Sequence, residues 1–238
     1  QCLDTNGAVA IGRYAMGAGD VANNYQIAIG HNAMAEITSG DANIGIGRSA
    51  LGVATSAHRN LAIGYQALDA TTSGDDNIAL GHSALGNLSA SGGHKNIAIG
   101  NYAGDGMAAV GNHTNNIFIG YDAGGGTWVT AVSNGNIAIG GYALDGALNG
   151  ANYNVAIGEY ALSNLTSADN TVAVGRNSGG SLTTGANNTL VGYEAGNTGT
   201  VDLAGGNSNT YIGSQTRGSS ASAINQTVIG KGAHGQGN

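Results

Sequence analysis

A five-residue string that ends in glycine recurs thirteen times along the 238-residue chain. Most copies read N-I-A-I-G or a close variant, such as NLAIG ending at Gly64 and NIAIG ending at Gly140. Successive final glycines are 17 to 21 residues apart. Self-similarity at a short fixed period is typical of a solenoid, in which each repeat forms one coil and stacks on its neighbours. We therefore predict an all-β parallel β-solenoid of about 13 coils, with residues 1–238 as a single repetitive domain.

Each string has the alternation of a short β-strand. The residue before the glycine and the residue two before that one are almost always β-branched or aliphatic, as in Ile97 and Ile99. In a strand these two positions share a face, and β-branched residues favour strands. The residue between them is alanine or glycine in nine of thirteen copies, with Phe118, Leu190, Tyr211 and Val228 as the exceptions. We expect the aliphatic pair to face the solenoid interior, and the small residue to face outward against a partner subunit or solvent.

The residues around each strand also recur. The final glycine allows a turn with positive φ, and alanine follows three residues later in eleven of thirteen copies. A leucine or methionine often comes next, and we expect it to point inward, as for Leu68 and Leu144. Asparagine precedes nine of the strands, and a stacked asparagine ladder can satisfy turn backbone and amide groups. We expect the remaining residues of each coil to form a turn and a short outer strand.

Composition excludes several classes of protein. The chain holds 44 glycines and no proline, only 9% of its residues are charged, and its formal net charge is −7. Seven scattered basic residues cannot replace the counterions of a nucleic acid, so no nucleic-acid partner is expected. No apolar run approaches the length of a membrane-spanning helix, so no membrane insertion is expected. The single Cys2 cannot form a disulfide within the chain, which leaves a free thiol or an intermolecular bridge.

The repeat N-(I/V)-A-(I/V)-G-x-x-A-(L/M) resembles the head repeats of trimeric autotransporter adhesins and the related repeats of phage tail fibres. The unit NLAIGYQALDATTSGDDN, from Asn60 to Asn77, carries the resemblance most clearly, and the similarity extends over essentially the whole chain. It implies a left-handed β-roll, a parallel homotrimer and an extracellular role in attachment. The coils here are longer than the compact repeats of typical autotransporter heads, so larger outer loops are expected.

No residue pattern indicates catalysis or a cofactor. Asp122 and Glu159 follow strand-ending glycines two coils apart, about 9–10 Å along the stack, which borders on the spacing for inverting glycoside hydrolysis. Both are expected on an open ridge, as ordinary surface carboxylates. The histidines lack metal-ligand spacing, and Asp75–Asp76 lacks the spacing of calcium-binding rolls. We predict a non-enzymatic protein with no cofactor and no metal site.

Binding is expected at exposed aromatic residues and enlarged loops. Seven tyrosines fall in the two positions after a strand-ending glycine, among them Tyr121, Tyr142 and Tyr160. Such a ridge could contact sugars or protein receptors, or it could cover a subunit seam or shield the turns. Trp128, the only tryptophan, and His113 fall in the longest inter-strand segments. We name these five residues as the candidate binding site.

The functional prediction is a trimeric fibre or head segment on a cell surface or virion, which binds a host-surface glycan or protein receptor. The alternative is a structural spacer or self-assembling filament with no receptor of its own. An ice-binding solenoid is a third interpretation, but it needs a regular outward array of threonine, whereas the expected outward ladder is alanine.

Overall fold

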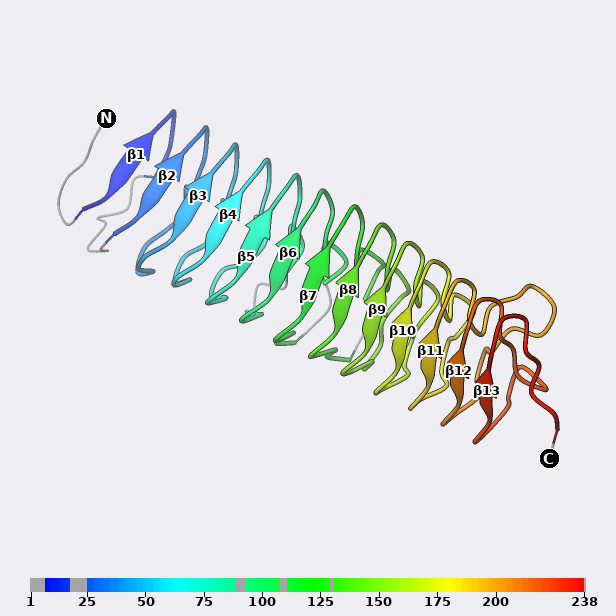
Figure 1. Cartoon of the computed structure of the whole chain (residues 1–238). Coiled ribbons are helices and arrows are strands. Elements are labelled where there is room, and N and C mark those ends of the chain that lie inside the picture. Colours follow the sequence, from blue (N-terminus) through cyan, green and yellow to red (C-terminus); the bar gives the residue numbers. More distant parts are fainter. Residues whose placement is uncertain (1–6, 18–24, 89–92, 108–110, 129–130, 238) are drawn as a thin grey trace. The chain divides into compact units, whose positions relative to one another are not determined.

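The computed structural model describes residues 7–17, 25–88, 93–107, 111–128 and 131–237. Cys2 lies outside the described residues. By its internal contacts the chain divides into two compact units, residues 1–116 and residues 117–238. Both units repeat the same coil, so the prediction of a parallel β-solenoid is confirmed (Figure 1). That the whole chain is one domain stays a prediction.

Every glycine-terminated string forms a three-residue β-strand. The first unit holds β1 (Val9–Ile11), β2 (Ile27–Ile29), β3 (Ile44–Ile46), β4 (Leu61–Ile63), β5 (Ile78–Leu80) and β6 (Ile97–Ile99). The second unit holds β7 (Ile117–Ile119), β8 (Ile137–Ile139), β9 (Val155–Ile157), β10 (Val172–Val174), β11 (Thr189–Val191), β12 (Thr210–Ile212) and β13 (Thr227–Ile229). Within each unit, consecutive strands pair in parallel with equivalent positions opposite each other, as Ala138 lies opposite Ala156. Each coil therefore adds one strand to the sheet.

The predicted orientation of the strands is wrong. The middle residue of every strand is buried, and the two aliphatic residues that flank it are half-buried or exposed. In β4, Ala62 has no exposed surface, whereas Ile63 is 39% exposed. In most coils the returning chain leaves room for only a small residue at the middle position of the strand. Small residues therefore line the interior, and the larger aliphatic side chains stand outside.

The rest of the interior comes from the chain's return path. In most coils the alanine three residues after the strand-ending glycine and the following leucine or methionine are buried, which confirms that prediction for Leu68 and Leu144. A further apolar column lies seven or eight residues after the glycine. Its buried members are Ile37, Ala54, Leu88, Met107, Trp128, Leu148, Leu165 and Leu182. In the coils of β2, β5, β8 and β9, one small strand residue thus packs against two larger side chains of the return path.

In some coils the middle residue of the strand is large and a residue of the return path is correspondingly small. Phe118 is fully buried, and Gly124 stands where other coils carry leucine or methionine. A Cβ atom added to Gly124 would lie 2.5 Å from Cδ1 of Phe118. Leu190 packs in the same way against Gly179 and Gly196. In these two coils a large middle strand residue therefore takes space that a leucine or methionine of the return path fills in other coils.

The predicted asparagine ladder is confirmed as a buried column that precedes the strands. The backbone N–H of Asn77 donates to Oδ1 of Asn60 at 2.9 Å, and Nδ2 of Asn77 donates to the same atom at 3.1 Å. Nδ2 of Asn77 also donates to the carbonyl oxygen of Gly93 at 2.8 Å. These bonds repeat from coil to coil and satisfy amides that water cannot reach. The ladder thereby fixes the register of neighbouring coils.

The expected outer strand is replaced by turns. Outside the named strands, the described residues form only isolated parallel bridges, such as His94 with Thr114. The second and fourth residues after the strand-ending glycine have positive φ in most coils, for example Tyr142 at 57° and Leu144 at 55°. The strand-ending glycine itself stacks on its counterpart, since a Cβ on Gly140 would lie 2.7 Å from the carbonyl carbon of Gly158. Close backbone stacking is what requires glycine at this position.

Candidate functional site: an aliphatic sheet face and a tyrosine row

The outer side of the strands forms an apolar surface on each unit. We call the first and third residues of the strands the aliphatic face. In the first unit these twelve residues are all valine, isoleucine or leucine, and in the second unit threonine enters only at the first position of β11, β12 and β13. No charged residue interrupts the face in either unit. An array of this kind is far larger than the scattered apolar side chains that a soluble monomer exposes.

The aliphatic face also changes the ice-binding interpretation. The outward positions carry aliphatic residues rather than alanine, and an outward threonine column exists only at Thr189, Thr210 and Thr227. Three threonines do not make the regular array which that interpretation needs.

The turn after each strand places an aromatic row on the second unit. Tyr142 and Tyr160 stack with ring centroids 5.1 Å apart and an interplanar angle of 1°. Tyr121 meets Tyr142 edge-on at 5.4 Å. Tyr121 is 49% exposed and Tyr160 is 37% exposed. We call these three residues the tyrosine row, and its members are the predicted site residues that the fold brings together at the surface.

The geometry of the tyrosine row limits what it can bind. Because Tyr142 and Tyr160 cover each other's faces, the row offers ring edges and hydroxyl groups rather than open ring faces. Burial, together with Tyr121, Tyr160 and Asp122 nearby, raises the pKa of the Tyr142 hydroxyl, so this group remains a hydrogen-bond donor at neutral pH. A row of phenol groups with apolar ring edges suits polyhydroxylated or amphipathic ligands.

A second aromatic row lies at the corresponding turns of the first unit. His82 stacks on Tyr65 at 5.1 Å with an interplanar angle of 8°, and it meets Tyr102 edge-on at 4.8 Å. Arg48 lies over the Tyr65 ring at 5.3 Å. In both units, therefore, aromatic side chains of neighbouring coils contact each other at the turns. These contacts stabilise the turns and leave aromatic ring edges exposed.

Trp128 does not form an exposed contact, contrary to expectation. Its side chain is 2% exposed and packs edge-on against Phe118, with ring centroids 5.7 Å apart. It occupies the interior column that holds Leu148 in the next coil. The sequence carries this signal, because Trp128 stands eight residues after Gly120 as Leu148 stands eight residues after Gly140.

His113 is also interior, so it cannot contact a receptor in this fold. It has no exposed surface, and its carbonyl oxygen accepts a hydrogen bond from Nδ2 of Asn96 at 2.9 Å. His113 stands three residues before Asn116, at a position that is glycine or alanine in most other coils. The small residues of this column already indicate that it is confined.

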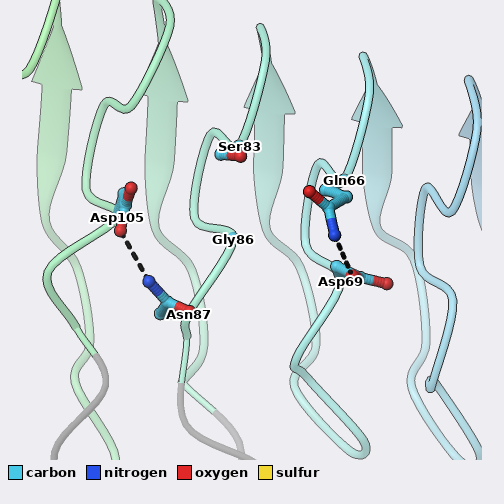
Figure 2. A pocket seen from close by; sticks show the side chains of 6 residues that line it. All are labelled: Gln66, Asp69, Ser83, Gly86, Asn87 and Asp105. Atoms are coloured by element: carbon cyan, nitrogen blue, oxygen red, sulfur yellow. Dashed lines mark hydrogen bonds between the residues drawn. The ribbon is translucent and has the colours of Figure 1, made fainter.

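A small polar niche lies on the first unit beyond the turns (Figure 2). Its volume is about 90 Å³, and it is lined by Gln66, Asp69, Ser83, Gly86, Asn87 and Asp105. Nε2 of Gln66 donates to Asp69 at 3.2 Å, and Nδ2 of Asn87 donates to Asp105 at 2.7 Å. Burial raises the pKa of Asp69. Among the described residues, no group of three or more histidine, cysteine, aspartate or glutamate side chains could hold a metal ion.

The two carboxylates considered for catalysis lie in different surroundings. Oε2 of Glu159 accepts a hydrogen bond from Nε of Arg176 at 3.1 Å, and both side chains are more than half exposed. Burial raises the pKa of Asp122. Burial also raises the pKa of Asp145 to about 6, with a further contribution from Asp122. The pair that interacts is therefore Asp122 with Asp145.

Asp145 makes the stability of the second unit depend on pH. Its carboxyl binds a proton more tightly in the folded chain than in the unfolded chain, where the pKa is about 3.9. Its stabilising contribution is complete below pH ~4 and is lost as pH rises to about 6. We expect Asp145→Asn to raise the free energy of unfolding at pH 7 by about 1 kcal/mol, allowing for solvent screening at this half-buried site. Urea denaturation at pH 4 and pH 7 tests this, and an equal difference at both pH values would contradict it.

Comparison with protein-family models, with curated proteins and with solved structures returned no match. Among the described residues, no helix is long and apolar enough to cross a membrane. The basis for assigning a function is therefore the geometry of the surfaces described above.

Proposed function

We propose that the chain is a segment of a non-enzymatic, extracellular fibre or head that attaches to a host or other surface. In this proposal three parallel copies, each a left-handed β-roll, associate along their aliphatic faces. The observation that carries the proposal is the uninterrupted aliphatic face on each unit. Parallel sheets occur almost only where both faces are covered, and strands that read as continuous apolar runs are typical of such burial.

A second copy of the chain is the occupant that fits the aliphatic face. The face presents side chains at the strand spacing of about 4.8 Å, and an identical sheet has grooves with the same repeat. Since the face carries no charge in either unit, two copies can meet without burying unpaired ions. The interface thus differs from the one expected from sequence, because the aliphatic residues take the place of the alanine ladder.

The tyrosine row supports the attachment part of the proposal. It stands at the turns rather than on the aliphatic face, so Tyr121, Tyr142 and Tyr160 stay accessible when that face is covered. A trimer would present the row three times, and weak contacts would add through avidity. The same aliphatic face is compatible with a spacer or filament that has no receptor, so attachment itself must be measured.

The oligomeric state tests the first part of the proposal. We expect light scattering to give the mass of a trimer for the wild-type chain and a monomer for Ile157→Glu. In a free monomer Ile157 is 37% exposed, so the glutamate is tolerated there, whereas three carboxylates buried in an interface are not. Asn177→Glu, on the turn where the next coil carries Glu194, is the matched control and should remain trimeric. A monomeric wild-type protein would contradict the proposal.

Binding to immobilised cells and matrix glycans tests the second part. We expect the double variant Tyr142→Ser/Tyr160→Ser to lose at least tenfold in apparent affinity while it remains trimeric. Serine already occupies this positive-φ column at Ser49 and Ser83, so the turn should be preserved. Tyr153→Ser removes a tyrosine that is 65% exposed in another column, which holds Ser208, and serves as control. A trimer that attaches to no surface would favour the spacer function instead.

A further inference from the structure

A surface pocket on the first unit is distinct from the polar niche described above. It has a volume of about 410 Å³ and is lined by Asp75, Asp76, His94, Lys95, Thr114 and Asn115. These residues come in three pairs, each of which stands two positions and one position before a ladder asparagine. The second residues of the pairs, Asp76, Lys95 and Asn115, have φ values of 59–60°. The three pairs therefore share one backbone conformation and place different side chains at equivalent positions.

Hydrogen bonds hold the inner groups of this pocket in place. Nδ1 of His94 accepts a hydrogen bond from the backbone N–H of Asp75 at 3.0 Å. This bond requires an unprotonated Nδ1, so the hydrogen of the neutral ring is on Nε2, which becomes a donor. Oδ1 of Asp75 accepts a hydrogen bond from the backbone N–H of His58 at 2.8 Å. The imidazole and this carboxylate are therefore held by the coil itself.

Arg59 interacts with both acidic groups of the pocket. Nε and Nη2 of Arg59 donate to the two carboxylate oxygens of Asp76 at 2.6 Å and 3.1 Å. Hydrogen bonding to Arg59 lowers the pKa of Asp76, with smaller contributions from the charges of Arg59 and Lys95. Oδ2 of Asp75 lies 3.9 Å from Nη2 of Arg59 and 3.9 Å from Nδ1 of His94. The pocket is therefore not simply an acidic cluster.

Lys95 is the cation of this pocket that remains available. Within the described part of the chain, its ammonium group makes no hydrogen bond and no ion pair within 4.0 Å, although its charge contributes to lowering the pKa of Asp76. A lysine at positive φ is also less favourable than asparagine or glycine there. The same column of the second unit holds Gly135, Tyr153, Asn170, Asn187, Ser208 and Asn225. Since the coil forms without a cation at this position, folding alone does not explain Lys95.

We propose that this pocket binds the carboxylate-bearing unit of an acidic saccharide. The Lys95 ammonium and the Nε2–H of His94 are the donors for the sugar carboxylate. The side-chain amide of Asn115 forms hydrogen bonds with ring hydroxyls of the sugar. The lone pairs of Asp76 that do not face Arg59 accept hydrogen bonds from such hydroxyls. The volume fits one such unit of a chain that continues along the open surface. This names a ligand class for attachment and rests on the function proposed above.

Calorimetric titration with a uronate-containing tetrasaccharide at low ionic strength tests the proposal. A neutral tetrasaccharide of the same linkage is the matched ligand. We expect the acidic ligand to bind and the neutral one to bind at least tenfold more weakly. Raising the salt concentration should weaken binding, because the ammonium and carboxylate meet at an exposed site.

Three variants locate the binding. Lys95→Asn places at this position the residue found at Asn170 and Asn187, so the fold is preserved while affinity for the acidic ligand falls at least tenfold. Asn115→Gly, which introduces the residue found at Gly135 in the same column, should weaken both ligands through lost hydroxyl contacts. Lys231→Asn makes the same charge change in the second unit and should leave affinity unchanged.

Four results would overturn the proposal: no binding of the acidic ligand, equal binding of the neutral one, unchanged affinity in Lys95→Asn, or an equal loss in Lys231→Asn. Acetate that competes as strongly as the tetrasaccharide would also overturn it, because the site would then be specific for an anion and not for a sugar. Attachment is measured separately on surfaces. A chain that binds the tetrasaccharide but attaches to nothing would overturn the attachment function and leave the pocket established.

Discussion

Replacing Phe118 by alanine is expected to lower the free energy of unfolding by about 3–5 kcal/mol. The phenyl ring is fully buried in the interior of its coil and packs against Trp128. Its removal leaves a cavity that the thin coil cannot close, because the hydrogen-bonded columns on both sides hold the coil's width. Urea denaturation at a fixed protein concentration measures the loss.

The same position offers an internal control for this explanation. Gly124→Leu alone should also destabilise the protein, since a Cβ atom at residue 124 would meet the Phe118 ring at 2.5 Å. The double variant Phe118→Ala/Gly124→Leu should recover most of the stability, because it reproduces the arrangement of Ala138 with Leu144. Leucine is compatible with this backbone, as Leu144 has a φ of 55°. Additive losses in the double variant would show that the two residues do not share one volume.

Replacing Asn77 by alanine is expected to lower the free energy of unfolding by about 3 kcal/mol. Its side-chain amide donates to Asn60 and Gly93, and its Oδ1 accepts the backbone N–H and the Nδ2–H of Asn96. Alanine leaves the Asn96 N–H and the Gly93 carbonyl buried without their partners. Each such group costs about 1–3 kcal/mol. Thermal and urea denaturation followed by circular dichroism measure the effect.

Thr171 provides the natural comparison for this ladder. It occupies the asparagine position, and its hydroxyl accepts the Asn188 backbone N–H at the long distance of 3.4 Å. Asn77→Thr should therefore cost less than Asn77→Ala, and Thr171→Asn should stabilise the second unit by about 1 kcal/mol. If Asn77→Ala and Asn77→Thr have the same free energy of unfolding, the side-chain hydrogen bonds of the ladder do not contribute the stability assigned to them.

Most of the architecture follows from short-range signals. The strands, the positive-φ turns, the inward leucines and the asparagine ladder each recur at a fixed offset from glycine, so one coil predicts the next. The orientation of the strands could not be derived from alternation alone, because alternation defines two faces without saying which is inside. The paired changes at Phe118 with Gly124 and at Leu190 with Gly196 do carry that information. They show that the middle strand residue and the return path share one interior.

The candidate site was predictable only in part. Tyr142 and Tyr160 share a turn column, Tyr121 stands one position earlier in its turn, and the fold brings the three rings together. Trp128 and His113 were misassigned because an unusual residue in a long segment suggests an exposed loop. Their offsets from the neighbouring strands match interior columns instead. The lining of the pocket around Lys95 lies at one fixed offset before three ladder asparagines, but the differing side chains in that column did not by themselves indicate a pocket.

The amino-acid sequence alone determines the coil: its period, its strand, its turns and the columns in which like residues stack. Those features depend on contacts between equivalent residues of adjacent coils. A repeat places these equivalent residues next to each other whatever the cross-section of the coil. The folded chain decided which side of the strand is interior, because that depends on the width left by the return path. In most coils this width admits only alanine or glycine at the middle of the strand, and the flanking aliphatic residues form a face outside on each unit.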